Sequence, residues 1–501
     1  MPLERLTKWL SNPWWGLVSL MLLQTRVLWG AWDYLDLVHY DPSAYFSTSR
    51  QLAAELIFPA LDWSPFYISY YAPFHKIWDT PFTIFLAHYL LMIYVILVLF
   101  YVLCRRLFSP GTAWILGVYF TVTYGVVYAE PLRYFILGVL LSTLLIAVTK
   151  PRFQKGFILV GLCLAMLTRP EFGFAFLLLS AWFLSEDYRK SNLRLALYPY
   201  RPLLILGLIM PILILRGGGI NSGRSRQAFG QHFCTQYAAR HPEMESCEAT
   251  MGRLFDYADS PVKAFLVNPG AMLEHMFWNF KQFRTELPAV LGTVTSPAVS
   301  SLLWAGICLL IVVGGWQLVR RWNWQLLRCE YLYPILFAIV LFNLLSALTI
   351  NSYRVFIIPF LIPFMLLVGA LLETVLKQHS RWLLLLFPVM IFLLPMPMRS
   401  PTPQINGQLV DAMRPVAPGE PYALLSEPRY GVCLYVSATP CQNIPPASTD
   451  DFASWLVDNQ VAVILVSPAL DLTSEQISYV EQQYNHYRTI QEVQIFIKPQ
   501  R

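Results

Sequence analysis

The chain has 501 residues, of which 56% are hydrophobic and only 13% are charged. Soluble domains carry about 25% charged residues, so this composition excludes an ordinary soluble protein. The net charge of +6 is accounted for by the basic loops described below, and it gives no indication of nucleic-acid binding.

The chain begins with a segment that resembles a signal peptide, MPLERLTKWLSNPWWGLVSLMLL. Its apolar run is long and no small-residue cleavage site follows, so we predict a retained first membrane span. A span needs about 20 mainly apolar residues. By that criterion the sequence predicts about eleven spans, near 14–32, 82–104, 112–129, 134–149, 156–168, 172–185, 202–216, 299–319, 331–350, 355–375 and 382–397.

Lysine and arginine residues gather at alternate ends of these runs. The connections between spans are expected to lie alternately on the two sides of the membrane. Those on one side hold sixteen basic residues, whereas those on the other side hold only five. The basic set is Arg5, Lys8, Arg105, Arg106, Lys150, Arg152, Lys155, Arg189, Lys190, Arg194, Arg201, Arg320, Arg321, Arg328, Lys377 and Arg381; the sparse set is Arg50, Lys76, Arg133, Arg169 and Arg354. Because basic loops stay in the cytoplasm, this asymmetry predicts a cytoplasmic N-terminus and an outer C-terminus.

Three large segments fall outside the cytoplasm by this assignment. The first, 33–81, contains a stretch with helical spacing at 43–58 that we expect to lie flat at the interface. The second, 217–297, opens with the glycine-rich GGGINSGRSRQ and contains an amphipathic helical pattern at 261–287. The third is the tail, which follows the proline-rich link MPMRSPTPQ.

The tail alternates between strand and helix patterns. Strands are predicted at 422–427 and 461–468, helices at Thr449–Asn459 and Ser474–Tyr484 with Thr449 and Ser474 as N-caps, and a hairpin in RTIQEVQIFIK. We therefore predict a mainly α, polytopic membrane domain over 1–398 and a small outward-facing α/β domain over 399–501.

The eight cysteines fall into two groups according to the predicted side of the membrane. Four lie in spans or at cytoplasmic ends, whereas Cys234 and Cys247 share one outer loop and Cys433 and Cys441 share the tail. Disulfides persist in oxidising compartments, so we predict local Cys234–Cys247 and Cys433–Cys441 bridges, with four free thiols as the alternative.

Unusual charges collect at the predicted outer ends of the spans. They are Asp33, Asp36, Asp41, Glu130, Arg133, Arg169, Glu171, Arg216 and Arg354. A carboxylate can accept the proton of an acceptor hydroxyl, and guanidiniums can bind a lipid-linked phosphate as it leaves. Sugar transfer from a polyprenyl-phosphate sugar needs both groups. No Asp-x-Asp pair is present, so a metal is optional: we expect no required cofactor, with a divalent metal possible.

Four motifs, in this order and on this side, carry a resemblance to a known family. They are Asp41-Pro-Ser-Ala-Tyr45 with Ser49-Arg50; Ala129-Glu130-Pro131-Leu132; Leu167-Thr168-Arg169-Pro170-Glu171; and Tyr353-Arg354-Val355-Phe356 with Pro359 and Pro363. The chain resembles the GT-C superfamily of membrane glycosyltransferases, and within it the bacterial members related to glycosyltransferase families 39 and 83. The tail matches only in its placement.

The resemblance implies roles for these residues. A first-loop acid is the family's proposed catalytic base, and Asp41 matches it best. Family members often show Asp-Glu here, whereas this chain has Asp41-Pro42, so Glu130 or Asp36 is the candidate for a second acid. Arg169 and Arg354, with Arg133 and Arg224, are candidates for the carrier phosphate. The implied protein is an inverting hexosyl or pentosyl transferase of the cell inner membrane and cell envelope.

Each assignment has a structural alternative. Asp36 could mark the point where the first helix enters water, and Asp41 could be the N-cap of the flat helix. Glu130 and Arg133 could form a local ion pair. Arg169 and Arg354 could be anchors at the membrane interface, and Arg224 could belong to a flexible solvated loop. The partners expected are a polyprenyl-phosphate sugar, a glycan or protein acceptor and the bilayer. Alternative functions are an O-antigen ligase or polymerase, a polytopic transporter, and a nonenzymatic membrane scaffold that has lost the role of Asp41.

Overall fold

The computed structural model describes part of the chain. The described residues are 12–34, 40–60, 64–78, 81–127, 131–190, 198–216, 224–241, 244, 246–295, 300–301, 305–308, 312, 330–350, 357–376, 408–409, 412, 423–425, 441–442, 449–458, 461–467 and 472–499. The chain divides into two units, of which the first comprises Met1–Leu28, Leu56–Tyr70 and Leu90–Pro397. The second comprises Trp29–Glu55, Tyr71–Tyr89 and Met398–Arg501.

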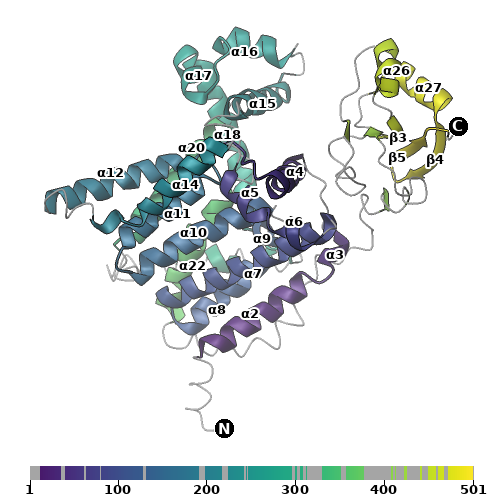
Figure 1. Ribbon diagram of the computed structural model, residues 1–501. Coiled ribbons are helices and arrows are strands. Elements are labelled where there is room, and N and C mark those ends of the chain that lie inside the picture. Colours follow the sequence, from purple (N-terminus) through teal and green to yellow (C-terminus); the bar gives the residue numbers. More distant parts are fainter. Residues whose placement is uncertain are drawn as a thin grey trace. The chain divides into compact units, whose positions relative to one another are not determined.

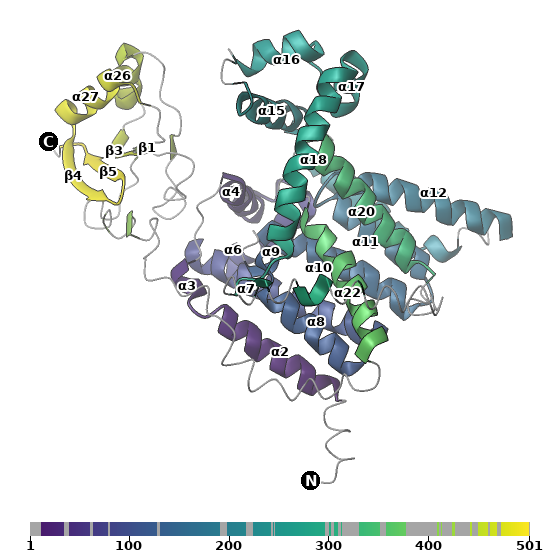
Figure 2. The same ribbon diagram turned by 180° about the vertical axis from the view of Figure 1, so that it is seen from behind.

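Apolar helices that lie side by side make up the first unit (Figures 1 and 2). They are α2 (Pro13–Val27), α8 (Pro110–Val122), α9 (Tyr124–Val127), α10 (Pro131–Thr149), α11 (Gln154–Met166), α12 (Phe172–Lys190), η1 (Tyr198–Tyr200), α14 (Leu203–Arg216), α15 (Arg224–Ala238), α16 (Cys247–Phe255), α17 (Pro261–Val267), α18 (Pro269–Leu291), α20 (Leu332–Thr349), η3 (Ile358–Phe360) and α22 (Leu361–Leu376). Many begin with proline, whose fixed φ and missing N–H suit a first helical position.

Two helices cross the boundary between the units, α5 (Pro65–Tyr71) and α7 (Pro81–Leu107). Among the described residues, four segments are long and apolar enough to cross a membrane: Thr83–Leu107, Leu132–Thr149, Leu332–Thr349 and Ile358–Val375. Their number and length are those of a multi-pass membrane protein. Several other predicted spans are shorter apolar helices here, and those near 299–319 and 382–397 lie largely outside the described residues.

Polar contacts bring several of the basic connections to one end of the helix bundle. Ser109, at the start of α8, donates to Glu373 Oε2 near the end of α22 from both its backbone N (3.1 Å) and its Oγ (2.8 Å). Lys155, at the start of α11, lies over the ring of Tyr331, which precedes α20, at 5.6 Å. The side of the membrane that this end faces stays a prediction.

The predicted span at 112–129 is not one helix, which corrects the sequence interpretation. Helix α8 ends at Val122, Thr123 is extended, and α9 starts at Tyr124. Tyr124 N donates to Gly292 O (2.7 Å), and Val294 N donates to Val122 O (2.8 Å). These two bonds pair backbone groups that the break would otherwise leave unsatisfied.

The segment predicted to lie outside the membrane at 217–297 ends in a long helix that contacts the bundle. This helix, α18, packs against α20 and α9. Asn279, which is fully buried, donates from Nδ2 to Leu348 O (2.8 Å), and His275 Nε2 lies 3.3 Å from Ile350 O. These side chains reach carbonyls at the end of α20 that have no partner within the helix. Farther from α20, Cys234 of α15 and Cys247 of α16 form a disulfide.

The second unit contains two regions, which are described separately. The first holds α3 (Ala31–Tyr34), α4 (Tyr40–Glu55) and α6 (Phe74–Ile77). The second is the tail, with β1 (Ala423–Leu425), β2 (Cys441–Gln442), α26 (Thr449–Asp458), β3 (Val461–Val466), α27 (Ser474–Gln483), β4 (Asn485–Ile490) and β5 (Val493–Ile497).

The tail forms one mixed sheet in the order β2-β1-β3-β5-β4. Strand β1 is parallel to β2 and β3, and β5 is antiparallel to β3 and β4, so the predicted hairpin is present. Phe452 of α26 and Val480 of α27 pack with Ile464 of β3 in its core. The N-cap of α27 is Thr473, in a capping box with Gln476, and Ser474 is the first helical residue instead of the predicted cap.

Replacing Asn279 with alanine is expected to lower the free energy of unfolding by about 1–3 kcal/mol, because a buried carbonyl of α20 loses its donor. Thr285→Ala, on the exposed side of α18, is the matched control and is expected to stay within about 0.5 kcal/mol. Thermal unfolding of the detergent-purified protein measures both. Equal shifts in the two variants would contradict the role of Asn279.

Candidate active site

The segment that carries the predicted base is a helix. Helix α4 begins at Tyr40, so Asp41 lies in its first turn. The described side chains of α4 start at Ala44, and they include an aromatic ring and a serine that contact α6. The structure therefore places the backbone of Asp41 at the N-terminal end of α4, as the pattern at 43–58 predicts within a few residues.

A serine–histidine hydrogen bond joins α4 to α6. Ser49, which is fully buried, donates from Oγ to Phe46 O (2.8 Å) and lies 2.8 Å from Nε2 of His75. The imidazole tautomer decides whether Ser49 Oγ or His75 Nε2 donates in this hydrogen bond. The ring of His75 also packs edge-on against Phe46, with ring centroids 4.7 Å apart.

Aromatic packing extends this contact to α7. Tyr71 packs edge-on against Phe46 at 5.9 Å and stacks on the fully buried His88 of α7 at 4.2 Å. Phe74 of α6 contacts the same histidine edge-on at 5.4 Å. Helix α4 is therefore held by a continuous aromatic cluster. His88, which the sequence places among aromatic residues in a span, is the packed centre of that cluster.

The surroundings of His75 favour the neutral form of its imidazole. Burial, and then the positive charge of Arg50 on α4, lower the pKa of His75 to about 4 from the ordinary value of 6.5. Both causes disfavour a charged imidazole at this contact. The docked state of α4 is thus the state with a neutral His75.

The predicted phosphate ligand Arg169 lies in the turn between α11 and α12. Its Nε donates to Glu171 Oε1 at 2.8 Å, and both side chains are largely buried. Ser64 Oγ donates to Thr168 O (2.7 Å), and Phe66 N donates to Leu167 O (3.2 Å), so the start of α5 is fixed to this turn. Arg169 thus has a carboxylate neighbour that the sequence interpretation did not assign to it.

Arg133 lies in the first turn of α10 and is half-buried. The next residue, Tyr134, donates from its hydroxyl to Val126 O, which ties α10 to α9. Arg224 is the first residue of α15. The sequence alternative for this residue was a flexible loop, whereas the structure places it in a helix. Of the remaining predicted residues, Asp36, Glu130, Arg354 and Cys433 lie outside the described residues, and Cys441 lies in β2. Convergence of these groups on one cavity stays a prediction.

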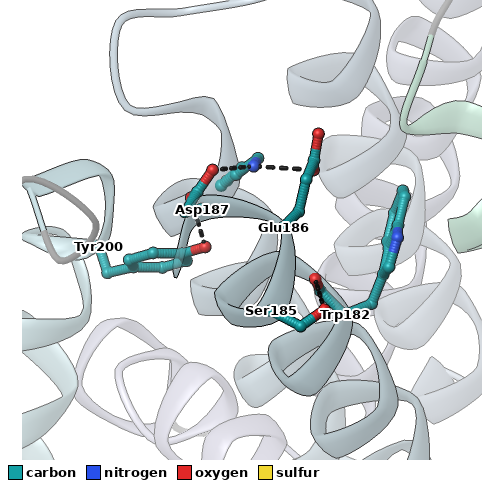
Figure 3. Close-up of polar contacts among 6 residues, drawn as sticks. Trp182, Ser185, Glu186, Asp187 and Tyr200 are labelled. Atoms are coloured by element: carbon teal, nitrogen blue, oxygen red, sulfur yellow. Dashed lines mark hydrogen bonds and ion pairs between the residues drawn. The ribbon is translucent and has the colours of Figure 1, made fainter. Parts of the chain in front are cut away.

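A charged cluster that the sequence interpretation missed lies at the basic end of the bundle (Figure 3). Lys155 Nζ lies 3.0 Å from Glu186 Oε2 and 2.5 Å from Asp187 Oδ1, and Tyr200 donates to Asp187 Oδ2 at 2.8 Å. Lys155 is only 8% exposed. The cluster joins α11, α12 and η1. Because each charged group is already paired, we assign it to the architecture and not to chemistry.

The described side chains include no group placed to bind a metal ion. Among them, no group of three or more His, Cys, Asp or Glu residues is placed to hold a metal ion. Asp36 and Glu130 are not in that set, so the divalent metal that the sequence allows stays a possibility on the sequence evidence alone.

Comparison with known proteins gives distant similarities to solved structures. No model of a known protein family matches the chain, and no curated protein matches it. The structure is similar to the crystal structure of the Archaeoglobus fulgidus oligosaccharyltransferase tethered with an acceptor peptide containing the NVT sequon via a disulfide bond. The TM-score is 0.45 and the sequence identity is 11%, over 92% of this chain and 70% of that chain. A similarity at this level carries no argument about the activity of this chain.

Stability is expected to fall as the pH drops from about 6.5 to about 4. In that window the unfolded chain binds a proton at residue 75 that the folded chain excludes, so the contribution is complete above about 6.5 and is lost toward about 4. The measurement is the unfolding temperature against pH for wild type and His75→Phe. The difference between the two curves reports the effect of His75, because the rest of the sequence is the same in both proteins. Parallel curves would contradict a neutral His75.

Lys155→Met is expected to lower the free energy of unfolding by about 1–3 kcal/mol, because it leaves two partly buried carboxylates without their cation. The matched control is Lys263→Met, which breaks an exposed i,i+4 pair with Asp259 and is expected to cost at most about 0.5 kcal/mol. Thermal unfolding in detergent measures both variants. A Lys155→Met protein as stable as the control would show that the cluster contributes nothing.

Proposed function

We propose that this protein is a membrane glycosyltransferase that moves a sugar from a polyprenyl-phosphate-linked donor to a lipid-linked glycan, a surface polysaccharide or a protein. The transfer would take place on the outer face of a bacterial inner membrane. The proposal rests on the ordered motifs of the sequence and on one structural observation. That observation is the position of Asp41 in the first turn of a helix that is docked through Ser49, His75 and Phe46.

This position suits a general base. The N-terminus of a helix carries a partial positive charge that favours an ionised carboxylate, and an ionised carboxylate can accept a proton. The docking contacts lie one and two turns farther along α4, so Asp41 belongs to an element that is fixed by other residues. A base held in this way loses little orientational freedom when the acceptor binds.

The proposed reaction has a simple balance of atoms and charge. The acceptor hydroxyl gives its proton to Asp41, and its oxygen forms a bond to the anomeric carbon. The bond from that carbon to the carrier phosphate breaks with inversion, and the carrier leaves as a phosphate monoester. Arg169 and Arg354, with Arg133 and Arg224, are the candidates to bind that phosphate. Glu171 beside Arg169 would also orient the guanidinium.

Asp41→Asn is expected to lower sugar transfer by at least about a hundredfold, since general-base catalysis contributes about 10²–10⁴-fold. The assay follows radiolabelled sugar from a series of polyprenyl-phosphate donors to acceptor lipids with protein purified in detergent. Glu55→Gln, at the exposed far end of α4, is the matched control and is expected to keep wild-type activity.

Each alternative outcome identifies a different error. Transfer that survives in Asp41→Asn would keep the enzyme class and move the base to Glu130 or Asp36. Absence of transfer by the wild type with every donor, in a protein that still binds the lipid, would contradict the proposed function and favour the ligase or scaffold alternatives.

A further inference from the structure

Helix α18 carries a narrow exposed stripe that no element of the described chain covers. Leu273, Phe277 and Phe280 are 54%, 71% and 52% exposed, and they follow one another at helical spacings of four and three residues. The opposite side of the helix is buried and includes His275, Asn279 and Phe283. The stripe is therefore the outer face of a helix whose inner face is already packed.

Two cations continue the same stripe. Lys281 follows Phe277 by one turn, Arg284 follows Phe280 by one turn, and both are exposed. Residues at such spacings are neighbours on a helix surface. Lys281 Nζ lies over the ring of Trp278 at 5.3 Å. Within the described part of the chain, no carboxylate pairs with either cation.

The depth of this surface is fixed by hydrogen bonds to a candidate membrane span. Asn279 donates to Leu348 O, and Leu348 lies one residue from the end of the span Leu332–Thr349. The rings of Phe277 and Phe280 therefore lie level with that end. At 1.5 Å per residue, Lys281 and Arg284 lie about 3 Å and about 8 Å farther along α18 than Asn279.

The remainder of α18 runs down beside the spans. Tyr119 of α8 donates to Leu291 O at 2.5 Å, and Phe283 packs edge-on against Phe360 at 5.4 Å. From Asn279 to Leu291 the helix covers about 18 Å at 1.5 Å per residue. Figure 2 shows α18 and α20 close together at the upper end of α20, below which the two helices diverge. Helix α20, which packs against α18, also has exposed apolar side chains: Phe337 is 62% exposed and Leu345 is 41% exposed. In a membrane such side chains would contact lipid.

We propose that α18 is a membrane-docking helix that enters the bilayer leaflet at the Thr349 end of α20. Phe277 and Phe280 contact the boundary between headgroups and acyl chains, and Lys281 and Arg284 bind phospholipid headgroup phosphates. Aromatic rings concentrate at this depth, and long basic side chains extend from just below it to the phosphates. The helical region α15–α17 is thereby anchored to the membrane. This inference does not depend on the proposed transferase activity.

Photocrosslinking in lipid nanodiscs tests the contact. The photoreactive amino acid p-benzoylphenylalanine replaces Phe277 in the full chain, and in a matched control it replaces Leu266 of α17, which is 75% exposed. At 1.5 Å per residue Asn268 lies about 16 Å beyond Asn279 on the side away from the span, so Leu266 is expected to be in water. We expect several-fold more phospholipid adduct at position 277 than at position 266, measured by mass spectrometry.

A second pair of variants tests the two cations. In nanodiscs that contain both phosphatidylglycerol and phosphatidylcholine, Lys281→Gln combined with Arg284→Gln is expected to lower the preference for the anionic lipid among the adducts at position 277 by about tenfold. Arg253→Gln, an exposed arginine on α16, is the matched control and is expected to leave the preference unchanged.

Several results would overturn the proposal, and the mass of the adduct tells them apart. Equal lipid adducts at positions 277 and 266, or none at either, would place the stripe in water. An adduct to a second copy of the chain would assign the stripe to a protein interface. An adduct that forms only when polyprenyl phosphate is added would assign it to a lipid-linked substrate.

Discussion

Backbone groups at membrane depth must find partners within the protein, because no water is available to them and each unsatisfied group costs several kcal/mol. This constraint explains the least regular part of the structure. The break at Thr123 is stable because residues 292–294 pair with residues 122–124. The end of α20 is stable because Asn279 and His275 reach its last carbonyls. Both solutions use α18 and the residues that follow it, so this helix is part of the helix bundle.

The same helix connects the bundle to the region that carries the disulfide. Phe233 of α15 and Met272 of α18 share one buried cluster, which includes the disulfide-bonded Cys234. Movement of this region is therefore limited at both ends of α18, by the cluster at one end and by α9 and α20 at the other. Helix α4 is fixed separately, through Ser49, His75 and the rings around His88.

Local patterns in the sequence predict the elements, whereas the partners of those elements lie too far away in sequence to predict. Spacing alone predicts a helix at 43–58, but His75 lies 26 residues from Ser49 and nothing marks it as the partner. The apolar run at 112–129 reads as one span because the strand-like segment that pairs with Thr123 lies far along the chain. Lys155 was counted as one more cytoplasmic charge, although Glu186 and Asp187 neutralise it. For the candidate site, the sequence therefore predicts which types of residue are present. It does not predict which residues lie close to one another in space.

The most direct test is a cryo-electron microscopy structure in lipid nanodiscs with a non-transferable polyprenyl-phosphate sugar analogue bound. The account predicts density for the sugar with its anomeric carbon beside the carboxylate of Asp41 at the start of α4, and phosphate density beside Arg169 or Arg354. Density for the analogue beside Lys155, or at a position remote from α4, would contradict this prediction.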